Sequence, residues 1–117
     1  MKKIKVKFKL FDDEWTAYLV DSHNPSLIVD GKSCTGATWL PQRKIYVSNE
    51  LDKFELKRTL THEVSHAVIY ATQFVMPEQY DEEQMCEFMA IYGETIVKKV
   101  ETIQVQMDFE LLNGDKE

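Results

Sequence analysis

The chain opens with a strict alternation of hydrophobic and polar residues, which predicts a β-strand. In the segment 3–10 every second residue is apolar and the residues between are lysines. This period of two is typical of a half-buried strand, and the lysines would protect a strand at the edge of a sheet from aggregation. A second strand-like run covers residues 14–20, after a turn at Asp12-Asp13.

Shorter strand-like runs follow, at Leu27-Val29, Cys34-Trp39 and Lys44-Val47. Asp30-Gly31 is a turn signal that would join the first two runs as a hairpin. Gly36 interrupts the second run, where it would mark a β-bulge or, less expectedly, a place where the backbone of a ligand approaches closely. The first half of the chain therefore predicts a small antiparallel sheet.

From about Asp52 to Gln73 the apolar residues recur at spacings of three and four, which predicts a helix. Asp52 with Glu55 three residues later is a capping-box start. One face of this helix would be apolar through Leu56, Leu60, Val64, Ala67 and Ala71. Asp81 with Gln84 offers another capping box, so a second helix is expected to begin there.

The second helix should continue through Ile96 and Val100, and the same spacing reaches Met107. Residues 103, 105, 107 and 109 also alternate as a strand would, so this segment could instead return to the sheet or cover a cleft. The expected fold class is α+β, with an N-terminal antiparallel sheet followed by two packed helices. Residues 1–112 would form a single domain, and residues 113–117 a flexible acidic tail.

The first predicted helix contains the pattern H-E-x-x-H, formed by His62, Glu63 and His66. Residues four apart share a helix face, so the two imidazoles could bind one Zn²⁺ ion while Glu63 reaches a water beside it. The chain has only 3 histidines, and an accidental match is expected in about one such sequence in a hundred or fewer. A catalytic zinc normally takes three protein ligands and leaves the fourth position for water.

Three acids at the start of the second helix are alternatives for the third ligand. Glu83 is ranked first, because it is in register with small and apolar residues expected where the second helix packs on the first. These residues are Cys86, Ala90 and Val97. Glu87 is ranked second because it aligns with a more polar strip, and Glu82 lies at the helix start, where it could simply favour the helix dipole.

Several motifs together resemble the ImmA/IrrE-type metallopeptidases, particularly the short versions found in phages and integrated elements. The similarity rests on TLTHEVSHAVIY at 59–70, KIYV at 44–47 and EQMCEFMA at 83–90. The resemblance implies a zincin-like fold, a zinc cofactor and peptidase activity. It also implies a third ligand seven residues before the position of Ala90, which again selects Glu83. The minigluzincins, small zinc peptidases of similar length, are a second possible relative.

The expected function is zinc-dependent hydrolysis of peptide bonds in a peptide or protein substrate, with Glu63 as the base. In zincins a strand beside the zinc helix can hold an extended peptide, and the runs 34–39 and 44–47 are both candidates. Specificity would come from rim residues such as Trp39 and Tyr46. The alternative function is a catalytically silent zincin-fold protein of a phage or mobile element that docks to a host protein.

Composition narrows the range of partners. With 117 residues, 44% of them apolar, the chain can form one hydrophobic core, and its net charge of −6 argues against nucleic acid as a partner. The alternating N-terminus excludes a signal peptide, and no apolar run is long enough to cross a membrane, so a cytoplasmic protein is expected. Nothing in the sequence indicates the oligomeric state.

The remaining chemically active side chains have ordinary interpretations. Cys34 and Cys86 would be buried thiols in a reducing compartment, and His23 a solvated loop residue. Three tyrosines are possible donors to a developing oxyanion, although packing in the core or at the rim is the stronger expectation for each. They are Tyr70, Tyr80 and Tyr92.

Overall fold

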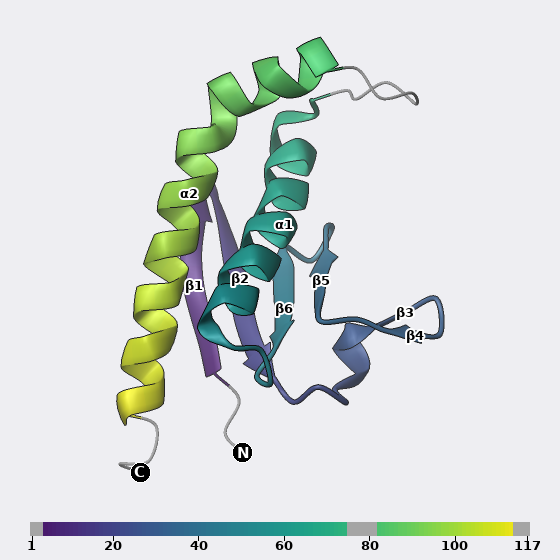
Figure 1. Cartoon of the computed structure of the whole chain (residues 1–117), viewed down its shortest axis with the longest axis vertical. Helices are drawn as coiled ribbons and strands as arrows, with labels where there is room; N and C mark the ends of the chain where they lie inside the picture. Colours follow the sequence, from purple (N-terminus) through teal and green to yellow (C-terminus); the bar gives the residue numbers. More distant parts are fainter. Residues whose placement is uncertain (1–3, 75–81, 114–117) are drawn as a thin grey trace.

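A four-stranded sheet followed by two helices forms the α+β fold of this chain, as seen in a computed structural model that describes residues 4–74 and 82–113 (Figure 1). The strand order in the sheet is β1-β2-β6-β5. The strands are β1 (Ile4–Leu10), β2 (Asp13–Val20), β5 (Gly36–Trp39) and β6 (Lys44–Ser48), and the helices are α1 (Lys53–Thr72) and α2 (Glu82–Asn113). Between β2 and β5 lie a short 3₁₀ helix, η1 (Pro25–Leu27), and a small hairpin of β3 (Ile28–Val29) and β4 (Lys32–Ser33).

The sheet is mixed, which corrects the prediction of an antiparallel one. β1 with β2 and β5 with β6 are antiparallel pairs, but β2 and β6 run parallel from Thr16 opposite Lys44 to Val20 opposite Ser48. Successive side chains point to opposite faces of a strand in either kind of pairing. The hydropathy pattern therefore predicted the strands without predicting their directions.

The hairpin at Asp30-Gly31 is confirmed, but its second strand is shorter than expected. Asp30 and Gly31 adopt positive φ angles of 52° and 77°, as a tight hairpin turn requires. Lys32–Ser33 pairs back onto Ile28–Val29, and the Cys34 amide donates to the Leu27 carbonyl at 2.8 Å. The chain then leaves the hairpin, and Gly36–Trp39 joins the main sheet beside β6. The predicted run 34–39 thus serves only in part as a strand, and it pairs with a different partner.

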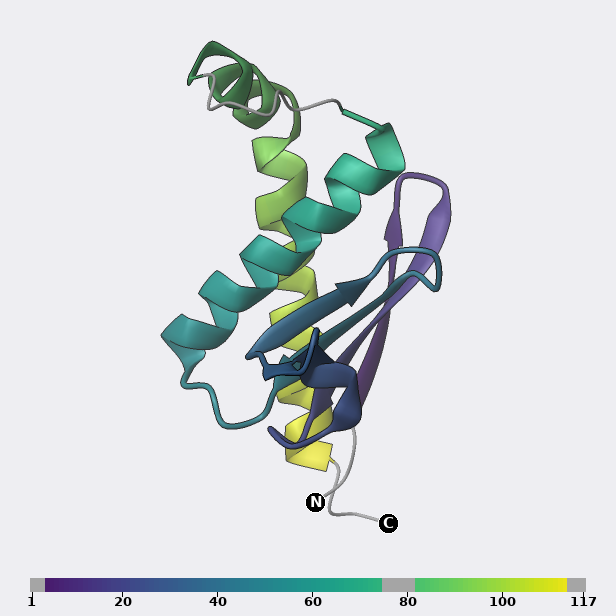
Figure 2. The same cartoon turned by 90° about the vertical axis from the view of Figure 1, so that its right-hand side faces the viewer.

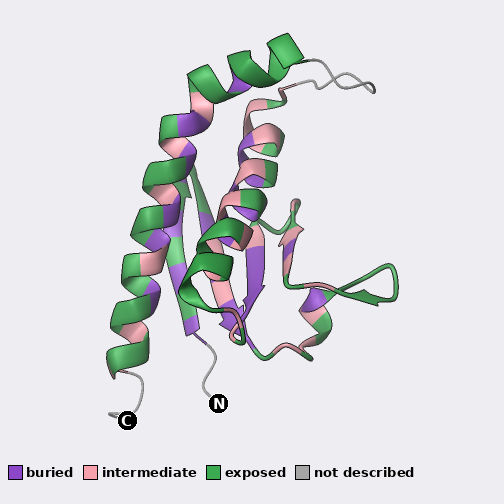
Figure 3. Ribbon diagram, viewed as in Figure 1, coloured by how far each residue is buried: buried purple, intermediate pink, exposed green. Residues whose placement is uncertain are grey.

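The first strand lies at one edge of the sheet and has the two faces that its sequence predicts. Ile4, Val6, Phe8 and Leu10 are buried, whereas the lysines at 5, 7 and 9 are exposed. Both helices cover the buried face of the sheet, α1 against β5 and β6 and α2 against β1 (Figures 2 and 3). On the opposite face, η1 covers a small apolar cluster formed by Val20, Leu27, Ala37 and Tyr46.

The bounds of α1 agree with the prediction to within a residue. Asp52 accepts a hydrogen bond from the Glu55 amide at 2.8 Å, and Glu55 Oε1 accepts one from the Asp52 amide at 3.2 Å, so both halves of the capping box form. The helix ends at Thr72 and is followed by the C-cap residue Gln73, whose φ of 54° is left-handed. The apolar stripe is buried at Leu60, Val64 and Ala67 and partly buried at its two ends.

The second helix runs without interruption to Asn113, so the strand and the cleft cover considered for its C-terminal part are wrong. Ile103 and Met107 are fully buried, and the helix packs against β1, at the opposite edge of the sheet from β5. The other two residues of the alternating run, Val105 and Phe109, are 69% and 56% exposed. No helix in the described part of the chain is apolar enough over a sufficient length to span a membrane.

Alanine substitutions in residues 103–109 test whether this segment packs as a helix or as a strand. We expect Met107→Ala to lower the free energy of unfolding by about 2–5 kcal/mol, because it leaves a cavity in the core. Val105→Ala should change that free energy by less than about 0.5 kcal/mol, because Val105 is a surface residue of the helix. In a strand both residues would share the buried face. Urea denaturation followed by circular dichroism measures both, and equal losses would contradict the helical packing.

Candidate functional site

The two histidines of the H-E-x-x-H pattern converge on one point at the exposed surface of α1. Their Nε2 atoms are 3.2 Å apart, and the ring centroids are separated by 4.9 Å. Two imidazole nitrogens bound at about 2.05 Å to a tetrahedral zinc ion would lie about 3.3 Å apart. The arrangement of His62 and His66 therefore fits two ligands of a single zinc ion.

Glu63 lies beside this pair and is buried, although it carries a carboxylate. Its side chain is 9% exposed, and Oε2 lies 4.0 Å from His62 Nε2. The Thr38 hydroxyl, from β5, lies 2.7 Å from Glu63 Oε1 and 3.2 Å from the Glu63 carbonyl oxygen. The shorter contact takes the single hydroxyl proton, which compensates part of the cost of burying the carboxylate. Thr38 thus engages one carboxylate oxygen, and the other faces His62.

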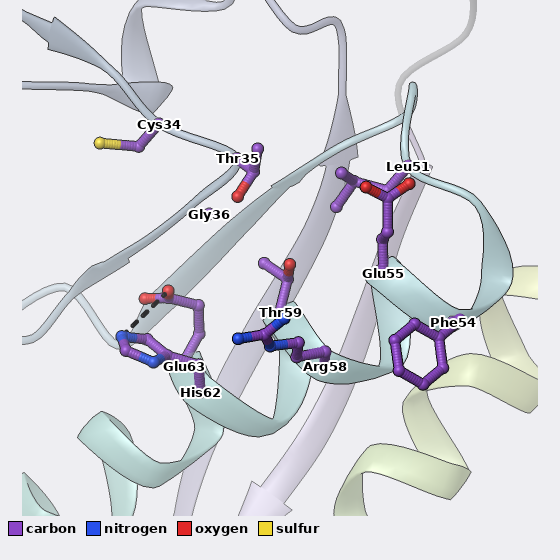
Figure 4. A pocket seen from close by; sticks show the side chains of 10 residues that line it. All are labelled: Cys34, Thr35, Gly36, Leu51, Phe54, Glu55, Arg58, Thr59, His62 and Glu63. Carbon is purple, nitrogen blue, oxygen red and sulfur yellow. Dashed lines mark ion pairs between the residues drawn. The ribbon is translucent and has the colours of Figure 1, made fainter.

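Gly36 allows β5 to pass close to α1 directly above Glu63. A β-carbon at this position would lie 2.5 Å from Thr59 Cγ2, 3.1 Å from Glu63 Cγ and 3.2 Å from Glu63 Oε2. Gly36 pairs regularly with Val47 of β6, so the predicted bulge is wrong. The groups that approach Gly36 are the side chains of Thr59 and Glu63 on α1. Glycine is required here by the spacing between the strand and the helix (Figure 4).

Gly36→Ala should lower the free energy of unfolding by about 1–3 kcal/mol, because overpacking forces β5 and α1 apart. Thr59→Ser removes the closest atom, Cγ2, while it keeps the hydroxyl. The double variant should therefore recover part of the loss, although the contacts with Glu63 remain. Thermal and urea denaturation of the wild type, the two single variants and the double variant give a double-mutant cycle, which measures the interaction energy between the two substitutions. Strictly additive effects would contradict the close approach of Gly36 to Thr59.

The described residues do not bring a third ligand to the histidine pair. No group of three or more His, Cys, Asp or Glu side chains in residues 4–74 and 82–113 is arranged to hold a metal ion. Glu82, Glu83 and Glu87 are all exposed on the first turns of α2. Figure 1 shows this end of α2 beyond the C-terminal end of α1, whereas the histidines lie nearer its middle.

The packing register used to rank Glu83 is wrong. Cys86, Ala90 and Val97 are exposed, and a different stripe of α2 is buried. That stripe consists of Phe88, Gly93, Ile96, Val100, Ile103 and Met107. The larger apolar side chains decide the register, because they remove more area from water than a cysteine or an alanine. Asp81, the expected cap of α2, lies outside the described residues.

A cavity of about 430 Å³ lies between α1 and the start of β5, next to Glu63 (Figure 4). The sequence did not indicate the part of Thr38 in the site, or that Phe54 and Arg58 line this cavity. The sequence did contain one indication for Arg58: it precedes His62 by four residues, so the two residues share a face of the predicted helix. The residues around the cavity are Cys34, Thr35, Gly36, Leu51, Phe54, Glu55, Arg58, Thr59, His62 and Glu63.

The predicted rim residues do not line this cavity. Tyr46 is buried on the opposite face of the sheet, where its ring stacks on Tyr18 with centroids 4.8 Å apart. The Trp39 side chain also projects from that face, because it alternates with Thr38, and its indole Nε1 donates to the Ser26 carbonyl at 3.1 Å. The cavity wall comes instead from α1, from Leu51 just before it and from the segment 34–36.

The remaining predicted side chains have mixed outcomes. Cys34 is half-buried and Cys86 is exposed, so the expectation of two buried thiols is wrong. His23 is an exposed loop residue, as expected. Tyr70 packs edge-on against Trp15, and Tyr92 lies in a cluster with Phe74 and Phe88, which agrees with packing roles for both. Tyr80 lies outside the described residues.

Comparison with known proteins adds no relative: the chain matches no protein-family model, no curated protein and no solved structure. The case for a function therefore rests on the residues of the site and on their geometry.

Proposed function

We propose that this protein is a cytoplasmic zinc metallopeptidase with a zincin-like fold, of the ImmA/IrrE type, which hydrolyses peptide bonds in a peptide or protein substrate. The observation that carries the proposal is the convergence of the His62 and His66 Nε2 atoms to 3.2 Å beside the buried carboxylate of Glu63. Two metal-binding imidazoles with a fixed acid at their side supply two of the three protein ligands and the base of a catalytic zinc site.

His62 and His66 would hold Zn²⁺ through their Nε2 atoms. Glu83, which the family resemblance selects, is proposed as the third ligand and Glu87 as its alternative, although the described residues do not place either beside the histidine pair. When bound, zinc acts as a Lewis acid that makes a water molecule nucleophilic near neutral pH. Glu63 would accept a proton from the attacking water and later deliver it to the leaving amine. Because Thr38 occupies Oε1, the oxygen that faces His62, Oε2, is the one proposed to carry this proton.

The substrate would lie along the edge of the sheet next to this site. β5 is the last strand in the sheet order and packs against α1. An extended peptide could add to β5 as a further strand, which would place its backbone over Glu63 and the histidines. Of the two runs considered from the sequence, only β5 lies at an edge, because β6 is paired on both sides.

Zinc content measured by inductively coupled plasma mass spectrometry tests the proposal. Protein purified without a metal-affinity resin should contain about one zinc per chain. Glu83→Ala should lose most of it, and Glu87→Ala, one turn away on the same helix, should retain it; the reverse pattern would reassign the third ligand to Glu87. Wild type without zinc, even after reconstitution, would contradict the peptidase and favour a docking protein of a phage or mobile element.

A further inference from the structure

Arg58 places a positive charge in the cavity that adjoins the proposed catalytic centre. It stands four residues before His62, so the two side chains project from the same face of α1, about 6 Å apart along the helix axis. Figure 4 shows its guanidinium directed along the cavity toward His62 and Glu63. The wall beside it is apolar at Leu51 and Phe54.

No acid in the described residues neutralises this guanidinium. Each carboxylate that shares the cavity with Arg58 has one oxygen engaged by another group. Glu55 Oε1 accepts the Asp52 amide in the capping box, and Glu63 Oε1 accepts the Thr38 hydroxyl. Neither Glu55 nor Glu63, nor any other described carboxylate, forms an ion pair with Arg58. Arg58 is exposed, and its guanidinium lines the cavity with no ion-pair partner among the described carboxylates, so its N–H donors are open to a ligand that enters there.

We propose that Arg58 is a specificity-determining residue that binds a carboxylate of the substrate next to the scissile bond. This inference rests on the proposed peptidase function. A guanidinium matches a carboxylate with two parallel hydrogen bonds, a geometry that lysine cannot reproduce. Neighbouring residues of an extended peptide are about 3.3 Å apart, so a side chain one or two residues from the cleaved bond lies within reach of Arg58. Preferred substrates carry Asp or Glu at that position.

The carboxylate could belong to an Asp or Glu side chain or to the C-terminus of the substrate, and cleavage specificity separates these sources. The probes are octapeptide pools, capped at both ends, with one position fixed as Asp, Asn, Glu, Gln or Lys. Cleavage is mapped by mass spectrometry. Wild type should cleave the Asp and Glu pools about tenfold or more faster than the amide pools when the fixed residue lies beside the cut. The same pools are also tested with a free C-terminus. Faster cleavage of these uncapped pools, with no preference for Asp or Glu among the capped pools, would assign the carboxylate to the chain end.

Substitutions at Arg58 assign the preference to this residue. Arg58→Gln should remove the discrimination between Asp and Asn, Arg58→Lys should restore only part of it, and Arg58→Glu should favour the Lys pool. Lys57→Gln is the matched control, because Lys57 is an exposed neighbour that carries the same charge but does not line the cavity. Equal losses in Arg58→Gln and Lys57→Gln would show a general charge effect and overturn the proposal.

A binding measurement tests the carboxylate site independently of the proposed peptidase activity. In zinc-loaded Glu63→Gln protein, the NMR signal of Arg58 Nε–H should shift on titration with the capped Asp pool. At least a tenfold higher concentration of the Asn pool should be needed to produce the same shift. Asp-dependent shifts without hydrolysis by the wild type would retain the carboxylate site and reject the peptidase. Hydrolysis without any preference for Asp or Glu, or equal response of Arg58 to both pools, would reject the carboxylate site.

Discussion

Glu63→Gln is expected to lower the rate of peptide hydrolysis by about 10²–10⁴-fold, because an amide cannot accept the proton of the attacking water. The substitution keeps the size of the side chain and leaves an amide oxygen to accept the Thr38 hydroxyl, which now lies 2.7 Å from Oε1. The fold and the zinc content should therefore be unchanged. Hydrolysis of an unfolded protein substrate, measured together with zinc per chain, gives both quantities.

The control for this substitution is Glu101→Gln, which removes the same charge from an exposed position on α2. It should hydrolyse the substrate at the wild-type rate. Full activity of a metal-clean Glu63→Gln preparation would overturn the role of Glu63 as the base. The same variant separates the two proposed functions in a cell, since a docking protein would keep its biological effect without this carboxylate and a peptidase would lose it.

Zinc should raise the melting temperature of the wild type by about 10 °C at a free concentration one hundred times its dissociation constant. Binding to the native state alone adds about 2.7 kcal/mol under this condition, and about 1 kcal/mol shifts the melting temperature of a domain of this size by about 3–6 °C. His66→Ala should lose most of this increase. Differential scanning calorimetry with added zinc and with a chelator measures the effect.

The structure supplies an internal control for the calorimetry. His66 is exposed, and the one hydrogen-bond contact of its ring described here is that with His62. In the presence of chelator, His66→Ala and wild type should therefore melt within about 2 °C of each other, because exposed substitutions change stability little. A wild-type melting temperature that is the same with zinc and with chelator would count against a bound metal.

The local elements of this fold were predictable because their signals are local. The capping box at Asp52 and the apolar spacing that follows it define α1, and alternation defines β1. The parallel pairing of β2 with β6 was not predictable, because it depends on how the segment 21–43 crosses from one strand to the other. The predicted register of α2 was wrong for a related reason. It rested on the stripes that contain Glu83 and Glu87, whereas packing is decided by the total apolar area that each stripe of the helix buries.

Only the residues of the H-E-x-x-H pattern could be predicted for the candidate site, and the residues that support them could not. The spacing of His62, Glu63 and His66 predicts that the two imidazoles share a face, and the structure brings them together. The support for Glu63 comes from β5, whose Thr38 and Gly36 lie more than twenty residues earlier in the chain and carry no motif. Contacts of this kind arise from tertiary packing, and a single sequence contains no periodic signal for them.

The packing of the first strand against the last helix has a consequence for synthesis on the ribosome. The apolar side of β1 is covered by α2, in which Met107 is fully buried. At translation rates of about 5–20 residues per second, the synthesis of α2 is complete only about 5–20 seconds after that of β1. Throughout that interval Ile4, Val6, Phe8 and Leu10 lack α2 to pack on, and the exposed lysines between them discourage the β1 strands of neighbouring nascent chains on one polysome from pairing edge to edge.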